Sequence, residues 1–123
     1  MNETTITFSL AFYKAAIMGQ AEGMSVTNYL ESVSGNSYMR GSVVALSTGP
    51  GIIPYGPVLV PGRMVIHNTD TVNNVTLFNG SGGTAFMLLL PSSWHMFYLA
   101  PAVVLYCQAV NAPVTMEYLL LPQ

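Results

Sequence analysis

The stretch that decides the fold is 84-TAFMLLLPSSWHMFYLAP-101, in which two short apolar runs are separated by a proline and two serines. Pro-Ser-Ser favours a turn, because proline fixes its own φ and serine hydroxyls bond the nearby backbone. Short runs rich in apolar and aromatic residues between such turns are typical of β-strands. We therefore predict strands over 84–90 and 94–100. The first is apolar on both faces, so we expect both of its faces to be buried.

Segments of the same character flank this stretch on both sides. The predicted strands cover residues 63–68, 74–79, 103–110 and 114–121, with turns at 68–70, 79–83 and 111–113. Regular short strands with frequent turns indicate a β-sandwich or a small barrel. We predict an all-β fold: an antiparallel, jelly-roll-like β-sandwich whose core comprises residues 58–123.

Residues 1–57 are less regular in pattern. Residues 4–10 and 38–46 each predict a strand, whereas residues 11–21 fit either a continued strand or one or two helical turns. Residues 48–61 contain four prolines, which predicts an irregular or edge-strand segment and the one natural hinge of the chain. We expect residues 1–57 to belong to the same domain or to form an arm that reaches a neighbouring subunit.

The composition combines an ample core with very few charges. The chain has 123 residues, enough for one domain, and 51% of them are hydrophobic. Only 7% are charged, against about 25% in an ordinary soluble domain. We therefore expect much of the surface to lie against other subunits. Nucleic acid is not an expected partner, because phosphate binding needs clustered lysines and arginines.

Membrane insertion and export are not expected either. A spanning helix needs about 20 consecutive apolar residues, and the longest candidate, 96–107, is interrupted by Pro101. Residues 1–5 lack the basic and apolar regions of a secretory signal. The single cysteine, Cys107, lies in an apolar run and is expected to be a small buried hydrophobe.

The inventory of catalytic groups is thin. His67 and Asp70 form a His-x-x-Asp pair, which in a small hydrolase would serve as a base and its orienting carboxylate. No Gly-x-Ser-x-Gly sequence accompanies it, so we interpret Asp70 as a turn cap and His67 as hydrogen-bonded to nearby backbone. His67, His95 and Cys107 lack the spacing of zinc ligands. We predict no enzymatic activity, catalytic residue, cofactor or metal site.

Aromatic residues and methionine gather in the predicted strand 94–100. Trp94, Met96 and Tyr98 share one face and Phe97 and Leu99 the other, because side chains alternate along a strand. One set faces the core, and the pattern does not choose between them. The outward set is a candidate interface, since Trp, Tyr and Met are enriched at interface centres. These aromatic rings also stack on sugars, so a glycan-binding face is the alternative.

The order of segments over residues 58–123 resembles a pattern common in small virion proteins of tailed bacteriophages. The resemblance is carried by 65-VIHNTDTVNNVTLFN-79, 89-LLPSSWH-95 and 104-VLYCQA-109. In that pattern a glycine usually follows the proline of the second segment, whereas this chain has Ser92.

The resemblance implies a β-sandwich that assembles symmetrically on a particle and carries no catalytic residues. We therefore expect a non-enzymatic virion structural protein, most simply a capsid decoration or cement protein that stabilises the particle by packing. Its expected partners are further copies of itself, as a homotrimer, and virion proteins such as the major capsid protein, without nucleic acid or membrane. The alternative is a fibre, tail or receptor-binding module that recognises surface glycans.

Overall fold

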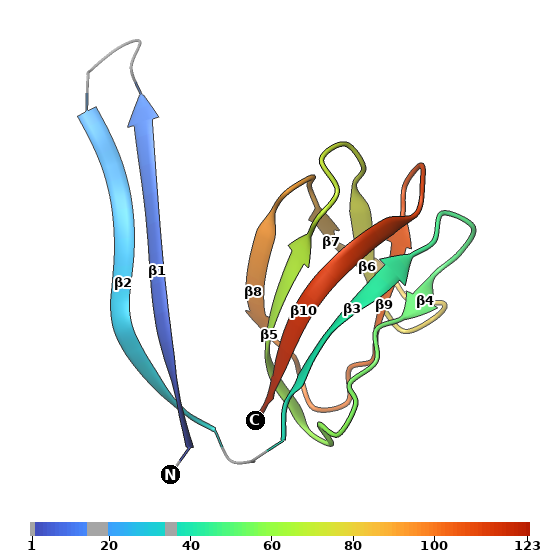
Figure 1. Ribbon diagram of the computed structural model, residues 1–123, viewed down its shortest axis with the longest axis horizontal. Helices are drawn as coiled ribbons and strands as arrows, with labels where there is room; N and C mark the ends of the chain where they lie inside the picture. The colour runs from blue at the N-terminus through green and yellow to red at the C-terminus, as the bar shows by residue number, and fades with distance from the viewer. Residues whose placement is uncertain (1, 15–19, 34–36) are drawn as a thin grey trace. The chain divides into compact units, whose positions relative to one another are not determined.

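The computed structural model describes residues 2–14, 20–33 and 37–123, with side chains from Ser37 onward. All regular structure in these residues is β-strand (Figure 1). Among them, no helix is long and apolar enough to cross a bilayer. The chain divides into two compact units, residues 1–34 and residues 35–123.

The first unit is a two-stranded antiparallel hairpin. Strand β1 (Asn2–Lys14) pairs with β2 (Gln20–Val33), with a register shift between Ile6 and Phe8. Of the segment 11–21, which fits strand or helix by sequence, residues 11–14 and 20–21 are strand. Residues 15–19 lie outside the described residues.

The second unit is a sandwich of two four-stranded antiparallel sheets. Its strands are β3 (Met39–Ala45), β4 (Gly51–Ile52), β5 (Pro61–Asn68), β6 (Val75–Asn79), β7 (Ala85–Leu89), β8 (Trp94–Tyr98), β9 (Leu105–Ala109) and β10 (Val114–Pro122). The first sheet has the order β3-β10-β5-β8 and the second β4-β9-β6-β7. This is the strand order of an eight-stranded jelly roll, and the predicted β-sandwich is confirmed (Figure 1).

The sandwich begins with β3 and not at residue 58. Strand β3 pairs with β10 from Ala45 opposite Val114 to Met39 opposite Leu120, and without it β10 would be an open edge. The proline-rich segment supplies the short edge strand β4, as its prolines permit. Two tyrosine hydroxyls anchor this segment to the sandwich by hydrogen bonds. Tyr118 Oη donates to the Pro54 carbonyl (2.7 Å), and Tyr55 Oη donates to the Val103 carbonyl (2.8 Å).

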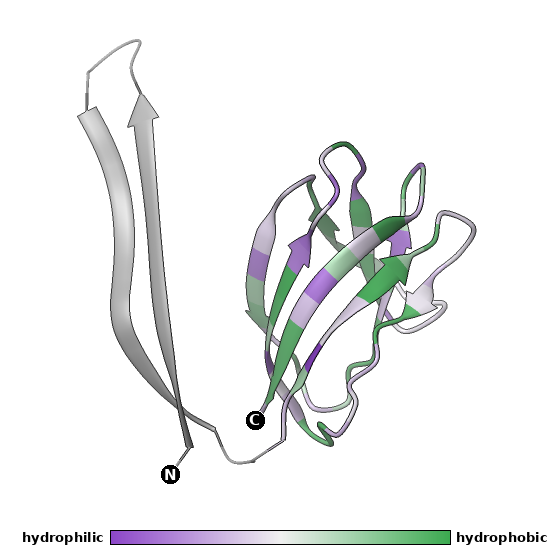
Figure 2. Cartoon of the chain, viewed as in Figure 1, coloured by the Kyte–Doolittle hydropathy of each residue, from purple (hydrophilic) through white to green (hydrophobic). Residues whose placement is uncertain are grey.

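The core lies between the inward faces of the two sheets. Along β10 every second residue from Val114 to Leu120 is buried. Figure 2 shows a hydrophilic band in the middle of this strand and hydrophobic residues at both of its ends. The largest fully buried hydrophobic side chains come from both sheets and the loop after β4: Ile53, Met64, Ile66, Leu77, Leu89, Leu105, Met116 and Leu120. Burial of such a side chain stabilises the fold by about 1.5–3 kcal/mol.

Strand β7 is not buried on both faces as predicted. Phe86 and Leu88 are half-exposed, at 49% and 48%, whereas Leu89 is fully buried. Strand β7 is the edge strand of the second sheet, and in a two-layer sandwich every strand has one outward face. Strand β7 therefore exposes apolar side chains on the surface of the sandwich.

The turn between β7 and β8 uses serine where a glycine is favoured. Ser92 has φ of 59°, in the left-handed region, and is the one non-glycine residue with positive φ among the described residues. Its N–H donates to the Asp70 carbonyl (2.8 Å), and the Ser93 hydroxyl donates to the Leu90 carbonyl (2.6 Å). The Pro-Ser-Ser turn is thus held by a backbone hydrogen bond at Ser92 and a side-chain hydrogen bond at Ser93.

We predict opposite effects of two substitutions at Ser92. Ser92→Val should lower the free energy of unfolding by about 1–2 kcal/mol, because a branched side chain is strained at positive φ. Ser92→Gly should leave it equal or raise it by up to about 1 kcal/mol. Urea unfolding measures both, with the same two substitutions at the exposed loop residue Thr71 as controls. A valine at Ser92 that is tolerated as well as glycine would contradict the strain.

Cys107 is fully buried on the inward face of β9, as predicted. Burial raises the pKa of its thiol from 9.0 to about 11. Because the folded pKa lies above the unfolded one, this group's stabilisation is complete below pH 9. It is lost as the pH rises from 9 towards about 11, where the unfolded chain releases the proton first.

Cys107→Ala should therefore flatten the alkaline loss of stability. Burial also raises the pKa values of Tyr55 and Tyr118, and their contribution remains in both proteins. Urea midpoints of the wild type and the variant at pH 8 and pH 10 test this. Equal losses in the two proteins would show that the thiol does not contribute.

Candidate functional site

The outward face of the first sheet carries its side chains in cross-strand rows. Strand register places one row over Ser42, Glu117, His67 and Trp94, and the next over Arg40, Leu119, Val65 and Met96. Arg63 and Tyr98 form the end of a third row. Trp94, Met96 and Tyr98 are thus the outward set of β8, whereas Phe97 packs against the core and Leu99 is buried.

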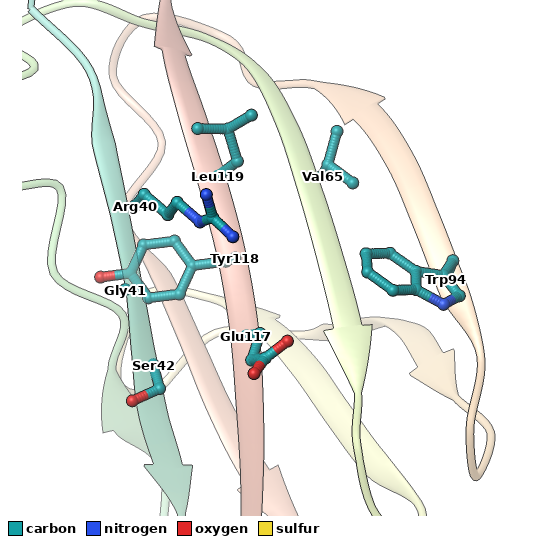
Figure 3. Close-up of a pocket in the computed structure, with 8 residues that line it drawn as sticks. All are labelled: Arg40, Gly41, Ser42, Val65, Trp94, Glu117, Tyr118 and Leu119. Atoms are coloured by element: carbon teal, nitrogen blue, oxygen red, sulfur yellow. The ribbon is translucent and has the colours of Figure 1, made fainter. Parts of the chain in front are cut away.

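These rows leave an open groove in the middle of the sheet. The central strands β5 and β10 contribute the short apolar side chains Val65 and Leu119. Arg40 stands on the β3 side and Trp94 on the β8 side, with Glu117 between them (Figure 3). The groove has a volume of about 570 Å³, within the roughly 300–1,000 Å³ of small-ligand pockets.

Trp94 is held against His67 by ring stacking. The two ring centroids are 3.9 Å apart and the ring planes differ by only 4°. The His67 side chain is 19% exposed, whereas Trp94 is 64% exposed. The indole therefore covers the imidazole and keeps a large surface in contact with solvent, extending from β8 towards β5 (Figure 3).

We predicted that His67 hydrogen-bonds to nearby backbone, but its Nδ1 makes no such bond in the described part of the chain. This atom is buried and has no hydrogen-bond partner among the described residues. Its nearest acidic neighbour is Glu117, whose Oε2 lies 3.9 Å away, beyond hydrogen-bond distance. The cause is strand register, because His67 lies directly between Glu117 and Trp94 in the row. An unpaired buried nitrogen is destabilising by about 1–3 kcal/mol.

Asp70 caps a turn, as predicted, and does not orient His67. Its Oδ1 accepts hydrogen bonds from the backbone N–H groups of Asn73 and Val72, both at 2.6 Å. These two bonds, that of Asn73 foremost, hold the pKa of the Asp70 carboxyl below its usual range. No hydrogen bond or ion pair joins the two members of the His-x-x-Asp pair in the described part of the chain.

The other candidate ligands lie in separate places. Cys107 is inside the sandwich on β9, whereas His95 is half-buried on β8 with Nε2 3.1 Å from the Ser93 hydroxyl. Residues 37–123, together with the described parts of the hairpin, hold no group of three His, Cys, Asp or Glu residues arranged for a metal ion.

Charge is concentrated on the face that carries the groove. Residues 37–123 contain four charged side chains, and Arg40, Arg63 and Glu117 all belong to this face. The Arg63 guanidinium lies over the Tyr98 ring, 4.2 Å from its centroid. The sequence pointed to Trp94 and Tyr98 but not to Arg40 or Glu117. Alternation does not choose which face of their strands is outward, and only the strand order brings Arg40 and Glu117 into the same groove as Trp94.

We predict that His67 restricts the motion of the Trp94 indole. His67→Ala removes the stacking partner and should lower the fluorescence anisotropy of Trp94, the only tryptophan of the chain. The matched control is His95→Ala, which leaves the stack in place. Unchanged anisotropy in His67→Ala would show that the indole is held by other contacts.

Comparison of the chain with known proteins adds no relative to this description. No protein family, curated protein or solved structure was found to match it.

Proposed function

We propose that this chain is a non-enzymatic structural protein of a virion, which stabilises the particle as a decoration or cement protein. The observation that carries the proposal is the outward face of the second sheet. Its register positions are occupied by Ile52, Thr76, Phe78, Leu88, Tyr106 and Gln108. None of these six residues is charged. Of the four charged residues in 37–123, Arg40, Arg63 and Glu117 lie on the opposite sheet and Asp70 lies in the loop after β5.

Apolar side chains on this face remain in contact with solvent. Ile52 is 52% exposed and Leu88 48% exposed, at opposite sides of the second sheet. Association that removes such surface from water is favourable by about 25 cal/mol per Å² of apolar area buried. Packing of this face on another protein chain would also account for the low overall charge.

The jelly roll and the resemblance to small phage virion proteins support the choice of a virion. Eight-stranded jelly rolls are common in viral capsid proteins and in lectins. The strand and turn order that carries the resemblance includes β6 and β9 of the uncharged face. The expected contacts are between copies, as a closed trimer, and between the trimer and the major capsid protein.

We predict that a charge on the uncharged face disrupts self-association. Wild-type protein should elute as a trimer in size-exclusion chromatography with light scattering. Leu88→Glu should weaken the association at least tenfold, about 1.4 kcal/mol, because it places an unpaired carboxylate in the interface. Val44→Glu is the matched control, since Val44 is 51% exposed on the other sheet.

Two results would overturn parts of this proposal. A wild-type monomer at micromolar concentration would contradict the trimer. Absence of the chain from purified particles of its source virus, measured by mass spectrometry, would contradict the virion role.

A further inference from the structure

We propose that the outward face of the first sheet binds a neutral glycan, with Trp94 as the platform for a sugar ring and Glu117 and Arg40 as its hydrogen-bonding partners. The inference does not depend on the assembly proposal, which uses the opposite face of the sandwich. It rests on the orientation of the indole, the charges of the groove and the size of the groove.

The indole of Trp94 is a preorganised apolar plane. A pyranose ring has C–H bonds on its faces and hydroxyls around its edge, so it needs a flat apolar surface beside polar groups. Trp94 is 64% exposed and is already stacked in parallel on His67. Because stacking orients the ring before binding, less side-chain entropy is lost when a sugar docks.

Glu117 and Arg40 supply the polar groups along the same groove. The Glu117 side chain is 64% exposed, and its carboxylate can accept hydrogen bonds from two neighbouring hydroxyls. Arg40, on the far side of the groove from Trp94 (Figure 3), presents a planar set of donors for hydroxyl and ring oxygens. Hydrogen bonds to charged groups are about twice as strong as neutral ones.

The opposite charges select a neutral ligand. A hydroxyl both donates and accepts, so one sugar can satisfy Glu117 and Arg40 together. A sugar carboxylate would gain from Arg40 but would lie in the same groove as the Glu117 carboxylate. A polyanion such as nucleic acid is disfavoured for the same reason.

The groove also suits a glycan better than a protein surface. Besides Trp94 and Tyr118, the apolar side chains that line the groove are Val65 and Leu119, and both are partly buried. A flat protein partner would strip water from Arg40 and Glu117, which is costly unless each charge is paired. A volume of about 570 Å³ accommodates a small oligosaccharide lying along the sheet.

The emission of the single tryptophan tests the site directly. The full chain is titrated with the neutral trisaccharides maltotriose, cellotriose, chitotriose and globotriose, and with sialyllactose as an acidic probe. We expect a saturable change in Trp94 emission with at least one neutral trisaccharide. Absence of saturable change with all four at tens of millimolar, or a response to sialyllactose alone, would overturn the proposal.

Isothermal titration calorimetry with the sugar that responds then measures how much each side chain contributes to the binding affinity. Trp94→Ala should weaken binding at least tenfold and Trp94→Tyr less, because tyrosine keeps a ring. Glu117→Gln should weaken it about tenfold, as expected for loss of a charge-assisted bond. Leu88→Ala, on the opposite face, should bind as the wild type does. Wild-type affinity in a Trp94→Ala protein that is folded by circular dichroism would overturn the glycan proposal. This result would leave the assembly proposal untouched if the variant still forms the oligomer.

Discussion

The pairing of β10 on both of its edges is the constraint on which the sandwich and its candidate site depend. This last strand lies between β3 and β5, so it joins the beginning of the jelly roll to its middle. Its inward residues from Val114 to Leu120 are all buried, and its outward residues Glu117 and Leu119 lie in the groove. Antiparallel ladders on both sides also satisfy its backbone polar groups, which a buried strand requires.

The two outward faces of the sandwich have different chemistry. The second sheet presents an uncharged face that includes Ile52 and Leu88, whereas the first presents Arg40, Arg63 and Glu117 with Trp94. Burial of the uncharged face on protein removes apolar surface from water without desolvating a charge. The charged face keeps its hydrogen-bonding capacity for a polar ligand. The assembly and the glycan binding that we propose would thus use opposite sides of one small domain.

The corner around Asn68 links the fold to the position of Trp94. Asn68 is fully buried, and its Nδ2 donates to the carbonyls of Asn73 (2.9 Å) and Leu89 (3.2 Å). Its N–H donates to the Ser93 carbonyl (3.0 Å), which sets the start of β8 beside the end of β5. A slip of one residue in this register would turn every side chain of β8 to the other face. The stack of Trp94 on His67 therefore depends on this corner.

The sequence by itself determined the strands and turns of the sandwich, the burial of Cys107 and the turn cap at Asp70. These depend on local chemistry: apolar runs bounded by proline, glycine and asparagine, and an aspartate that bonds its own backbone. Only the tertiary structure decided that the sandwich begins at β3, that β7 has an exposed face, that Trp94 faces outward and that Arg40 and Glu117 line the same groove as Trp94. The reason is that strand alternation defines two faces without choosing the inward one. That choice, and the neighbours of each strand, come from pairing between residues far apart in the chain.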